Sequence, residues 1–167
     1  KKLYIIMCGI FAYLGLYDKD LSIKQNYANK IKHRGPDNTI TKNINDTLYF
    51  HFHRLMINGL DDNSNQPFHI NGVWLICNGE IYNYRMLVNL NSFDYQTNSD
   101  CEVIIHMYLR HGIEKTCQML DGVFAFVLYD ENKDIVYVAR DHLGIRPLYI
   151  GREKTGGIAF ASEAKSL

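Results

Sequence analysis

The sequence has no excess of charge of either sign. Lysine and arginine together number 18, and so do aspartate and glutamate, which leaves a formal net charge of zero over 167 residues. A balanced charge supplies no long-range attraction toward nucleic acid or toward an anionic membrane surface. Neither class of partner is therefore expected.

Long hydrophobic runs are also missing. The longest nearly uncharged stretch, residues 3–17, contains two glycines and is short for a membrane span. Its basic start resembles a signal peptide, but it lacks a small-x-small cleavage site. A lipid-attachment cysteine usually follows a small residue, whereas Cys8 follows a methionine. A secreted or lipid-anchored protein is therefore the weaker interpretation of this segment.

Metal-binding cysteine patterns are absent as well. The four cysteines are Cys8, Cys77, Cys101 and Cys117, and none belongs to a C-x-x-C or a paired cysteine–histidine spacing. A zinc site is not expected from this arrangement. The count leaves a disulfide open, but four thiols in a chain of this length are typical of reduced cysteines.

Repeats, low-complexity segments and linkers are not found, so one folded domain is expected. Segments with the apolar character of strands are residues 9–16, 48–57, 73–78, 123–129, 135–139, 148–151 and 158–161. In VFAFVLY and IVYVA both alternating faces are apolar, which predicts strands covered on both sides. Helices are expected over residues 21–31, 84–90 and 99–112. This order favours an α+β fold with two sheets sandwiched by helices.

Two of the predicted helices carry end signals. The first has an apolar period that runs up to Gly35-Pro36, a typical helix stop. Before the third, Ser99 and Glu102 form a capping-box pattern, and Gly112 is expected to end the helix. The predicted apolar stripe of this helix consists of Cys101, Ile104, Ile105 and Tyr108.

Cys8 is the first candidate for chemistry. A lone cysteine at the start of a buried strand is more often a small core residue. Met7 changes this interpretation, because an initiator methionine is removed when a small residue follows it. Cys8 would then carry a thiol with a pKa of about 8.5 and a free α-amine with a pKa of about 7.7–8.0. Such an amine can take the thiol proton, which makes one residue both nucleophile and base.

Arg54 lies at the end of an apolar strand in the segment HFHRLMING. A cation in this position usually reaches solvent or a carboxylate, and the functional alternative is a guanidinium clamp for a substrate carboxylate. His51 and His53 share the opposite face of the strand and could chelate a metal, but no third ligand is in view.

The segment CNGEIYNY ends another apolar strand in Asn78, Gly79 and Glu80. An isolated Asn-Gly is most simply a turn. Alternatively, the side-chain amide of Asn78 and the backbone of Gly79 could donate hydrogen bonds to a developing oxyanion. Asp100 lies in the first turn of a predicted helix, where the helix dipole alone favours a carboxylate. None of these residues indicates a function by itself.

Nine motifs, taken together and in order, resemble one family. They are MCGIF, HRGPDN, HRLMI, QPF, NGEIYNY, SDCEVI, LDGVFAFVLYD, ARDHLGIRPLY and ASEAKSL. These motifs are similar to those of the glutaminase domain of glutamine-hydrolysing asparagine synthetases, a branch of the class II glutamine amidotransferases. The similarity covers residues 8–167. It implies a four-layer αββα sandwich of the N-terminal nucleophile hydrolase type.

The resemblance also implies a reaction, the hydrolysis of glutamine to glutamate and ammonia through a thioester. Cys8 would attack the side-chain amide with its own α-amine as base, while Asn78 and Gly79 hold the oxyanion. Arg54 would bind the α-carboxylate of glutamine. The other implied substrate-binding residues are Glu80 and Asp100 for the α-ammonium group and Leu55, Met56, Ile57 and Asn58 along the pocket. Arg34 and Asp37 of HRGPD are implied to shape the glutamine loop.

Two positions depart from the family pattern: HRGPDNTI lacks a glycine that commonly follows this motif, and Met56 stands where serine is usual. The chain also has no S-G-G-x-D-S and no G-x-x-x-x-G-K-[ST] motif. The ATP-using synthetase domain that would receive the ammonia is therefore expected outside this chain. ATP and Mg²⁺ are expected only there, with no cofactor in this domain. A homodimer of the full-length protein and a cytoplasmic location are further implications of the resemblance.

Residues 1–7 do not fit this picture, because a leader attached to Cys8 turns its nitrogen into an amide that cannot act as a base. We expect a domain over residues 8–167, preceded by a leader, cloning remnant or misplaced start that the working enzyme lacks. Two alternatives stay open. One is a catalytically silent module of the same fold, and the other is a different class II amidotransferase.

Overall fold

The protein is seen here as a computed structural model that describes residues 7–15, 21–154 and 156–167. These residues form two compact units. The first unit combines the chain up to Met56 with Pro147–Leu167, and the second is Ile57–Arg146. Each unit has its own antiparallel sheet, its own helices and its own apolar core.

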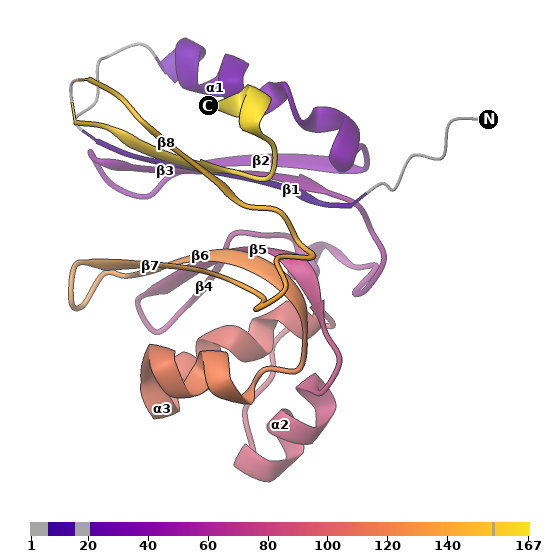
Figure 1. Cartoon of the computed structure of the whole chain (residues 1–167). Coiled ribbons are helices and arrows are strands. Elements are labelled where there is room, and N and C mark those ends of the chain that lie inside the picture. Colours follow the sequence, from indigo (N-terminus) through magenta and orange to yellow (C-terminus); the bar gives the residue numbers. More distant parts are fainter. Residues whose placement is uncertain (1–6, 16–20, 155) are drawn as a thin grey trace. The chain divides into compact units, whose positions relative to one another are not determined.

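The first unit is built on a five-stranded antiparallel sheet with the order β2-β3-β1-β9-β8 (Figure 1). Its strands are β1 (Gly9–Leu14), β2 (Asn38–Asn43), β3 (Leu48–Arg54), β8 (Tyr149–Arg152) and β9 (Ile158–Ala161). Its helical elements are α1 (Leu21–Asn29) and the 3-10 turns η1 (Lys32–Arg34) and η4 (Ala164–Ser166). Sequentially distant segments thus meet in this sheet, since β9 pairs with β1.

One face of this sheet packs against α1. The buried cluster between them consists of Phe11, Tyr13, Tyr49 and Ala161 from the strands together with Ala28 and Ile31. Because side chains alternate along a strand, odd positions of β1 and β3 point to α1 and even positions point to the opposite face. Every residue of β3 is buried, so both of its faces are covered.

Two buried histidines, His51 and His53, form a polar chain on the α1 face of β3. Their Nε2 atoms lie 3.1 Å apart. The hydroxyl of Thr41 lies 2.9 Å from Nδ1 of His51, and that of Thr39 lies 2.8 Å from Nδ1 of His53. Nε2 of His53 is also 3.1 Å from the carbonyl oxygen of Ala28. A carbonyl can only accept, so His53 carries its proton on Nε2, and Nε2 of His51 accepts from it.

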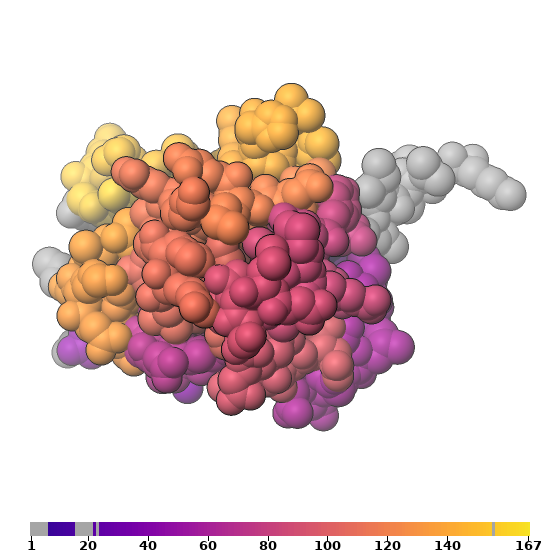
Figure 2. All heavy atoms as spheres, turned by 90° about the horizontal axis from the view of Figure 1, so that it is seen from below, coloured from indigo at the N-terminus to yellow at the C-terminus, as the bar shows by residue number. Residues whose placement is uncertain are grey.

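The second unit is built on a four-stranded antiparallel sheet with the order β4-β5-β6-β7. Its strands are β4 (Phe68–Ile70), β5 (Val73–Ile81), β6 (Gly122–Asp130) and β7 (Ile135–Arg140). Its helical elements are α2 (Tyr84–Asn91), α3 (Val103–Met119) and the 3-10 turns η2 (Asp62–Ser64) and η3 (Asp100–Glu102). Helices α2 and α3 form the face of this unit that Figure 2 turns toward the viewer.

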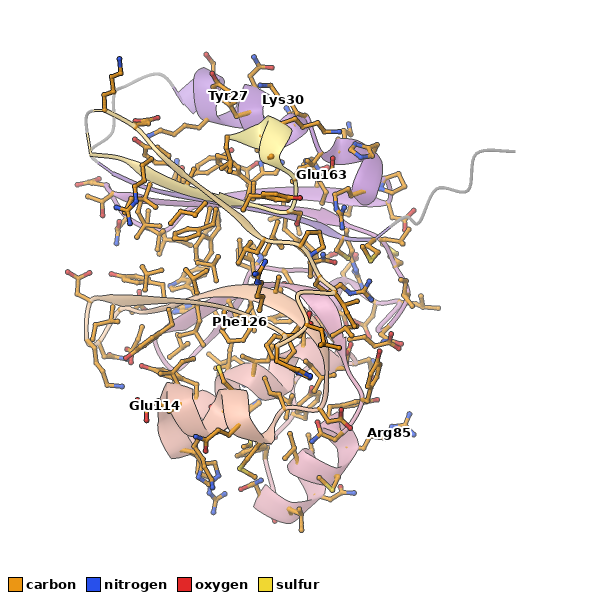
Figure 3. All side chains as sticks on the ribbon, in the orientation of Figure 1. Tyr27, Lys30, Arg85, Glu114, Phe126 and Glu163 are labelled. Atoms are coloured by element: carbon orange, nitrogen blue, oxygen red, sulfur yellow. The ribbon has the colours of Figure 1, made fainter. Side chains whose placement is uncertain are left out.

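The core of the second unit lies between its sheet and the two helices. Its fully buried members include Val73, Leu75, Cys77, Phe126 (labelled in Figure 3), Leu128, Leu87, Ile104 and Ile105. Burying a side chain of this size contributes about 1.5–3 kcal/mol. Cys77 points into this core. Because side chains alternate along a strand, Asn78 and Glu80 both point to the opposite face of β5. They therefore lie on the sheet face away from α2 and α3.

The motif ARDHLGIRPLY contains a loop that Asp141 ties to the start of β6. The Asp141 carboxylate accepts the backbone N–H groups of Phe124 at 3.2 Å, Ile145 at 2.9 Å and Arg146 at 3.0 Å. Burial acts to raise the pKa of this carboxyl, but the three backbone hydrogen bonds outweigh burial and lower it. The ionised side chain thus holds the chain after β7 against the beginning of β6.

The sequence located most of these elements, and the α+β class is confirmed. Strand β2 was not predicted because it is a polar edge strand, and β4 was not predicted because it has three residues. Residues 1–6 of the predicted leader and residue 16 of the first predicted strand lie outside the described residues. None of the described helices has the length and apolar character needed to cross a membrane.

The prediction that VFAFVLY and IVYVA are covered on both sides is right for the first and wrong for the second. Strand β6 is buried on both faces from Phe124 onward. Strand β7 is the edge of its sheet, and Ile135 and Val138 are exposed. An apolar edge strand with one covered face produces the same pattern in the sequence as a central strand.

The predicted capping box before α3 is also wrong. Ser99 accepts a hydrogen bond from the N–H of Cys101, because the first turn, η3, is a 3-10 turn. The carboxylate of Glu102 bonds instead to the preceding loop. At Gly112 the backbone leaves the helical region, with φ 76° and ψ 170°, as expected. A further helical segment to Met119 follows, which the sequence did not indicate.

Acidification is expected to destabilise the fold through His51. Burial, and then the charge of His53, lower the pKa of His51 from 6.5 to about 4. Below pH 6.5 the unfolded chain therefore binds a proton that the folded chain excludes, so stability falls as the pH drops from 6.5 toward 4. We expect the free energy of unfolding to fall by about 2 kcal/mol between pH 7.5 and 5, as measured by urea titration.

Two glutamine substitutions serve as controls for this experiment. His51→Gln keeps polar atoms at this position but cannot titrate, so its unfolding free energy should depend less on pH over the same interval. The exposed His111→Gln should retain the full dependence. Equal pH dependence in the wild type and in His51→Gln would contradict the role of His51.

Candidate active site

Cys8 directly precedes β1, and its thiol lies against the backbone of Leu55. The N–H of Leu55 points to Sγ at 3.3 Å, and the Leu55 carbonyl oxygen lies 3.5 Å from the same sulfur. The β1–β3 register pairs Gly9 with His53, so Cys8 and Arg54 are the next pair of neighbours along the two chains. Both occupy even positions, and their side chains therefore belong to the sheet face away from α1.

Arg34 holds the backbone of the candidate nucleophile. Its Nε donates to the carbonyl oxygen of Cys8 at 3.0 Å, and its Nη1 forms an ion pair of 3.1 Å with Glu163 (labelled in Figure 3). Burial acts to raise the pKa of Glu163, but hydrogen bonds from Lys165 and Arg34 outweigh it and lower the pKa. The sequence by itself indicates no role for Glu163, because only the folded chain brings ASEAKSL beside HRGPD.

Asp37 holds the residues that follow β3. Its N–H donates to the carbonyl oxygen of Arg54 at 3.1 Å, and its carboxylate accepts the N–H of Met56 at 2.8 Å. Gly35 makes this close approach possible, since a Cβ there would lie 2.2 Å from the carbonyl oxygen of His53. The HRGPD segment thus supports both Cys8 and the end of β3.

Leu55 to Asn58 were expected to continue the strand, and that expectation is wrong. Strand β3 ends at Arg54, which is buried. The N–H of Leu55 turns to the sulfur of Cys8 and the N–H of Met56 turns to Asp37, so neither extends the ladder. Ile57 is 62% exposed. The boundary between the two units falls inside this segment. Leu55 and Met56 belong to the first unit, together with Cys8 and Arg54, and Ile57 and Asn58 belong to the second.

Asn78 and Gly79 lie within β5, so the simple turn interpretation of Asn-Gly is wrong. Asn78 is 2% exposed, and among the described residues its side-chain Nδ2 is buried without a hydrogen-bond partner. Gly79 is required by packing, because a Cβ there would lie 2.7 Å from the carbonyl oxygen of Val123. A buried amide donor without an acceptor costs about 1–3 kcal/mol, which points to a ligand atom at this position.

Asp100 is buried and supports the end of β5. Its carboxylate accepts the N–H of Ile81 at 2.6 Å and the side-chain amide of Asn58 at 3.3 Å. Burial raises the pKa of Asp100, these hydrogen bonds oppose the rise, and the charge of Glu80 adds to it. Two carboxylates close enough to repel each other form an environment that a cationic group would stabilise.

The predicted site residues therefore divide between the two units. Cys8, Arg54, Leu55 and Met56 gather in the first, whereas Asn58, Asn78, Gly79, Glu80 and Asp100 gather in the second. Within the described part of the chain, no group of three or more His, Cys, Asp or Glu side chains could hold a metal ion. The four cysteines, all described, form no disulfide.

Known proteins are similar to this chain over most of its length. It is 45% identical to a glutamine-hydrolysing asparagine synthetase of Mus musculus and to another of Gallus gallus. It is 44% identical to the enzyme of Homo sapiens. Each comparison covers 96% of this chain but only 29% of the relative. The chain therefore spans less than a third of the length of these relatives.

The family comparison covers nearly all of the chain. A model described as the glutamine amidotransferase domain matches residues 7–167. This span includes Cys8, HRGPD and the residues of β5, so every motif that the sequence analysis singled out lies within it. Two antiparallel sheets with their own helices agree with the N-terminal nucleophile hydrolase type of fold that such a domain implies. The chain belongs to the glutamine amidotransferase domain family.

Proposed function

We propose that this domain hydrolyses the side-chain amide of L-glutamine to glutamate and ammonia, with Cys8 as the nucleophile. The observation that carries the proposal is the hydrogen bond of 3.3 Å from the N–H of Leu55 to the sulfur of Cys8. A donor aimed at sulfur is complementary to the negative charge of a thiolate. The neighbouring Arg54 supplies the cation that a substrate carboxylate requires.

In the first step the α-amine of Cys8 takes the thiol proton, and the sulfur attacks the carboxamide carbon of glutamine. The amine then returns the proton to the leaving nitrogen as the C–N bond breaks, which releases ammonia and leaves a thioester. This base exists only when Cys8 is the first residue. The domain over residues 8–167 is therefore the proposed working form, without the leader.

The tetrahedral intermediate between these events carries an oxyanion. We assign its stabilisation to the side-chain amide of Asn78 and the backbone N–H of Gly79. The buried Nδ2 of Asn78, which has no acceptor among the described residues, supports this role. A donor held in place without water around it stabilises developing charge without reorganisation, which is the principle of an oxyanion hole.

Substrate recognition is assigned by charge. The guanidinium of Arg54 would bind the α-carboxylate of glutamine in a bidentate manner. Glu80 and Asp100 would bind the α-ammonium group, because their mutual repulsion is relieved by a cation. Leu55, Met56, Ile57 and Asn58 would line the rest of the pocket.

Water then attacks the thioester and restores the thiol, with glutamate as the product. We propose that the ammonia passes to a synthetase domain outside this chain, which uses ATP and Mg²⁺ to make asparagine from aspartate. The relatives support this partner, since they are asparagine synthetases of which this chain spans 29%. A homodimer of the full-length protein and a cytoplasmic location are parts of the same proposal, and cysteines without disulfides accord with a reducing compartment.

The central test is glutamate release by protein that begins with Cys8. This protein should hydrolyse glutamine, whereas Cys8→Ala should not, because no other group in the proposal forms the thioester. Protein with residues 1–7 attached should also be inactive, since its Cys8 nitrogen is an amide. Intact mass measurement must accompany each assay to establish the first residue.

Two outcomes would contradict this proposal. Equal rates in the wild type and in Cys8→Ala would exclude Cys8 as the nucleophile and favour a silent module of the same fold. Activity in protein with the leader demonstrably intact would exclude the α-amine as the base.

A second prediction concerns the oxyanion. Asn78→Ala should lower kcat about 100- to 1000-fold, the usual effect of removing one oxyanion donor. KM for glutamine should change little, because the donor acts on the transition state and not on the bound amide. The exposed Asn89→Ala, in the same unit, is the matched control and should leave both constants unchanged. A rise in KM with kcat preserved would contradict this role for Asn78.

A further inference from the structure

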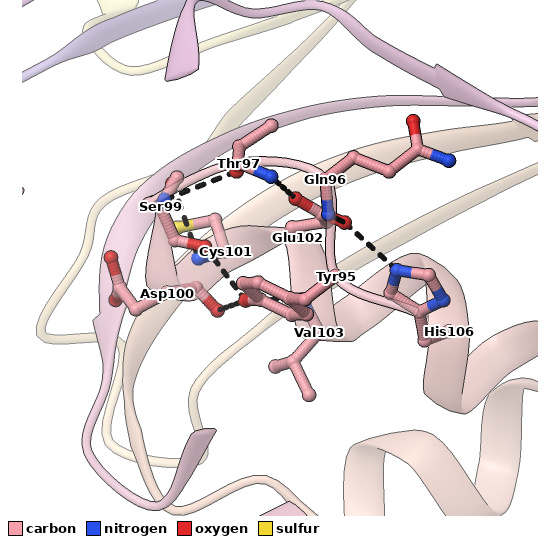
Figure 4. A network of polar contacts seen from close by, with 9 residues as sticks. All are labelled: Tyr95, Gln96, Thr97, Ser99, Asp100, Cys101, Glu102, Val103 and His106. Atoms are coloured by element: carbon pink, nitrogen blue, oxygen red, sulfur yellow. Dashed lines mark hydrogen bonds and ion pairs between the residues drawn. The ribbon is translucent and has the colours of Figure 1, made fainter. Parts of the chain in front are cut away.

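The tyrosine hydroxyl of Tyr95 contacts the backbone on both sides of the turn that carries Asp100 (Figure 4). It lies 2.7 Å from the carbonyl oxygen of Ser99 and 3.2 Å from that of Asp100. It also accepts the N–H of Val103 at 3.0 Å. One side chain thus bonds to the residue before Asp100, to Asp100 itself and to the first residue of α3.

Glu102 holds the loop that leads into the same turn. Its fully buried carboxylate accepts the backbone N–H groups of Gln96 and Thr97, both at 2.7 Å, and contacts Nε2 of His106 at 2.9 Å (Figure 4). Burial acts to raise the pKa of Glu102, but the hydrogen bonds from His106, Thr97 and Gln96 outweigh it and lower the pKa. The carboxylate is therefore ionised and bound from three directions.

Ring packing holds the tyrosine in place. The ring of His106 stacks on Phe93 and on Tyr95, with centroid distances of 5.1 and 5.7 Å. Burial, and then the charge of Glu102, raise the pKa of Tyr95 far above its ordinary value. The hydroxyl consequently stays protonated and can donate to a carbonyl at any pH at which the protein works.

What this network holds is the backbone of Asp100. The carboxylate of Asp100 already bonds to Ile81 and Asn58, so its direction depends on where η3 places its Cα. The proposed chemistry uses neither Tyr95 nor Glu102, and both are buried or half-buried away from solvent. The contacts of Tyr95 nevertheless converge on the turn that carries one of the two proposed ammonium ligands, and those of Glu102 hold the loop that leads into this turn.

We infer that Tyr95 and Glu102 are positioning residues for Asp100, and that they set the affinity of the domain for the α-ammonium group of its substrate. This inference rests on the proposed function. Neither residue touches the substrate. Both act by fixing the turn from which Asp100 presents its carboxylate, so their loss should weaken binding of ligands with an α-ammonium group and spare ligands that lack one.

The test compares Tyr95→Phe with the wild type, both beginning with Cys8. The substitution removes only the hydroxyl, so KM for glutamine should rise by at least about fivefold, the effect of losing a single neutral hydrogen bond, with kcat unchanged. The inhibition constant of 4-carbamoylbutanoate, which is glutamine without its α-amino group, should stay the same. Glu102→Gln, which keeps one acceptor oxygen, should show the same pattern.

Tyr129→Phe is the matched control, because it removes a tyrosine hydroxyl that bonds to Asp134 in the same unit, at 3.0 Å. It should leave both constants unchanged. An unchanged KM in Tyr95→Phe would overturn the inference, and so would an equal rise in KM and in the inhibition constant, since that indicates a general loss of structure. Absence of glutaminase activity in the wild type would instead contradict the proposed function, so the two failures are distinguishable.

Discussion

The antiparallel pairing of β1 with β3 is the constraint on which the candidate residues of the first unit depend. Its register brings the residue before β1 beside the last residue of β3, and alternation turns Cys8 and Arg54 to the same face. Once β3 stops at Arg54, the next two backbone N–H groups are released from the ladder. One meets the sulfur of Cys8 and the other meets Asp37. The proposed nucleophile and its surroundings thus lie at strand ends.

Buried carboxylates that accept backbone N–H groups organise the second unit. Asp100, Glu102 and Asp141 each accept backbone N–H groups. Hydrogen bonds lower the pKa of two of them despite burial: those from His106, Thr97 and Gln96 for Glu102, and those from the backbone for Asp141. Backbone donors are placed by the fold itself, so such carboxylates connect loops to strands with defined geometry. The proposed substrate site uses one of the three, Asp100, whose pKa burial raises.

In both units, the helices and the candidate polar residues lie on opposite faces of the sheet. In each sheet one face packs on helices through apolar side chains, and the candidate polar residues lie on the other face. Arg54 alternates away from α1, and Asn78 alternates away from α2 and α3. The helices can therefore be packed for stability without placing apolar side chains around the atoms that are proposed to react.

The sequence by itself determined much of this protein, because hydrophobic periodicity and motif spacing are properties of neighbouring residues. The features that could be predicted in this way are the α+β class, seven strands, three helices and the motifs around Cys8, Arg54, Asn78 and Asp100. The edge strand β2, the end of β3 at Arg54 and the bonding of Glu102 to its preceding loop were not readable. These features depend on which backbone donors remain after the strands have paired. These remaining donors exist only in the folded chain, and so does the burial of the Asn78 side-chain amide, which has no acceptor among the described residues.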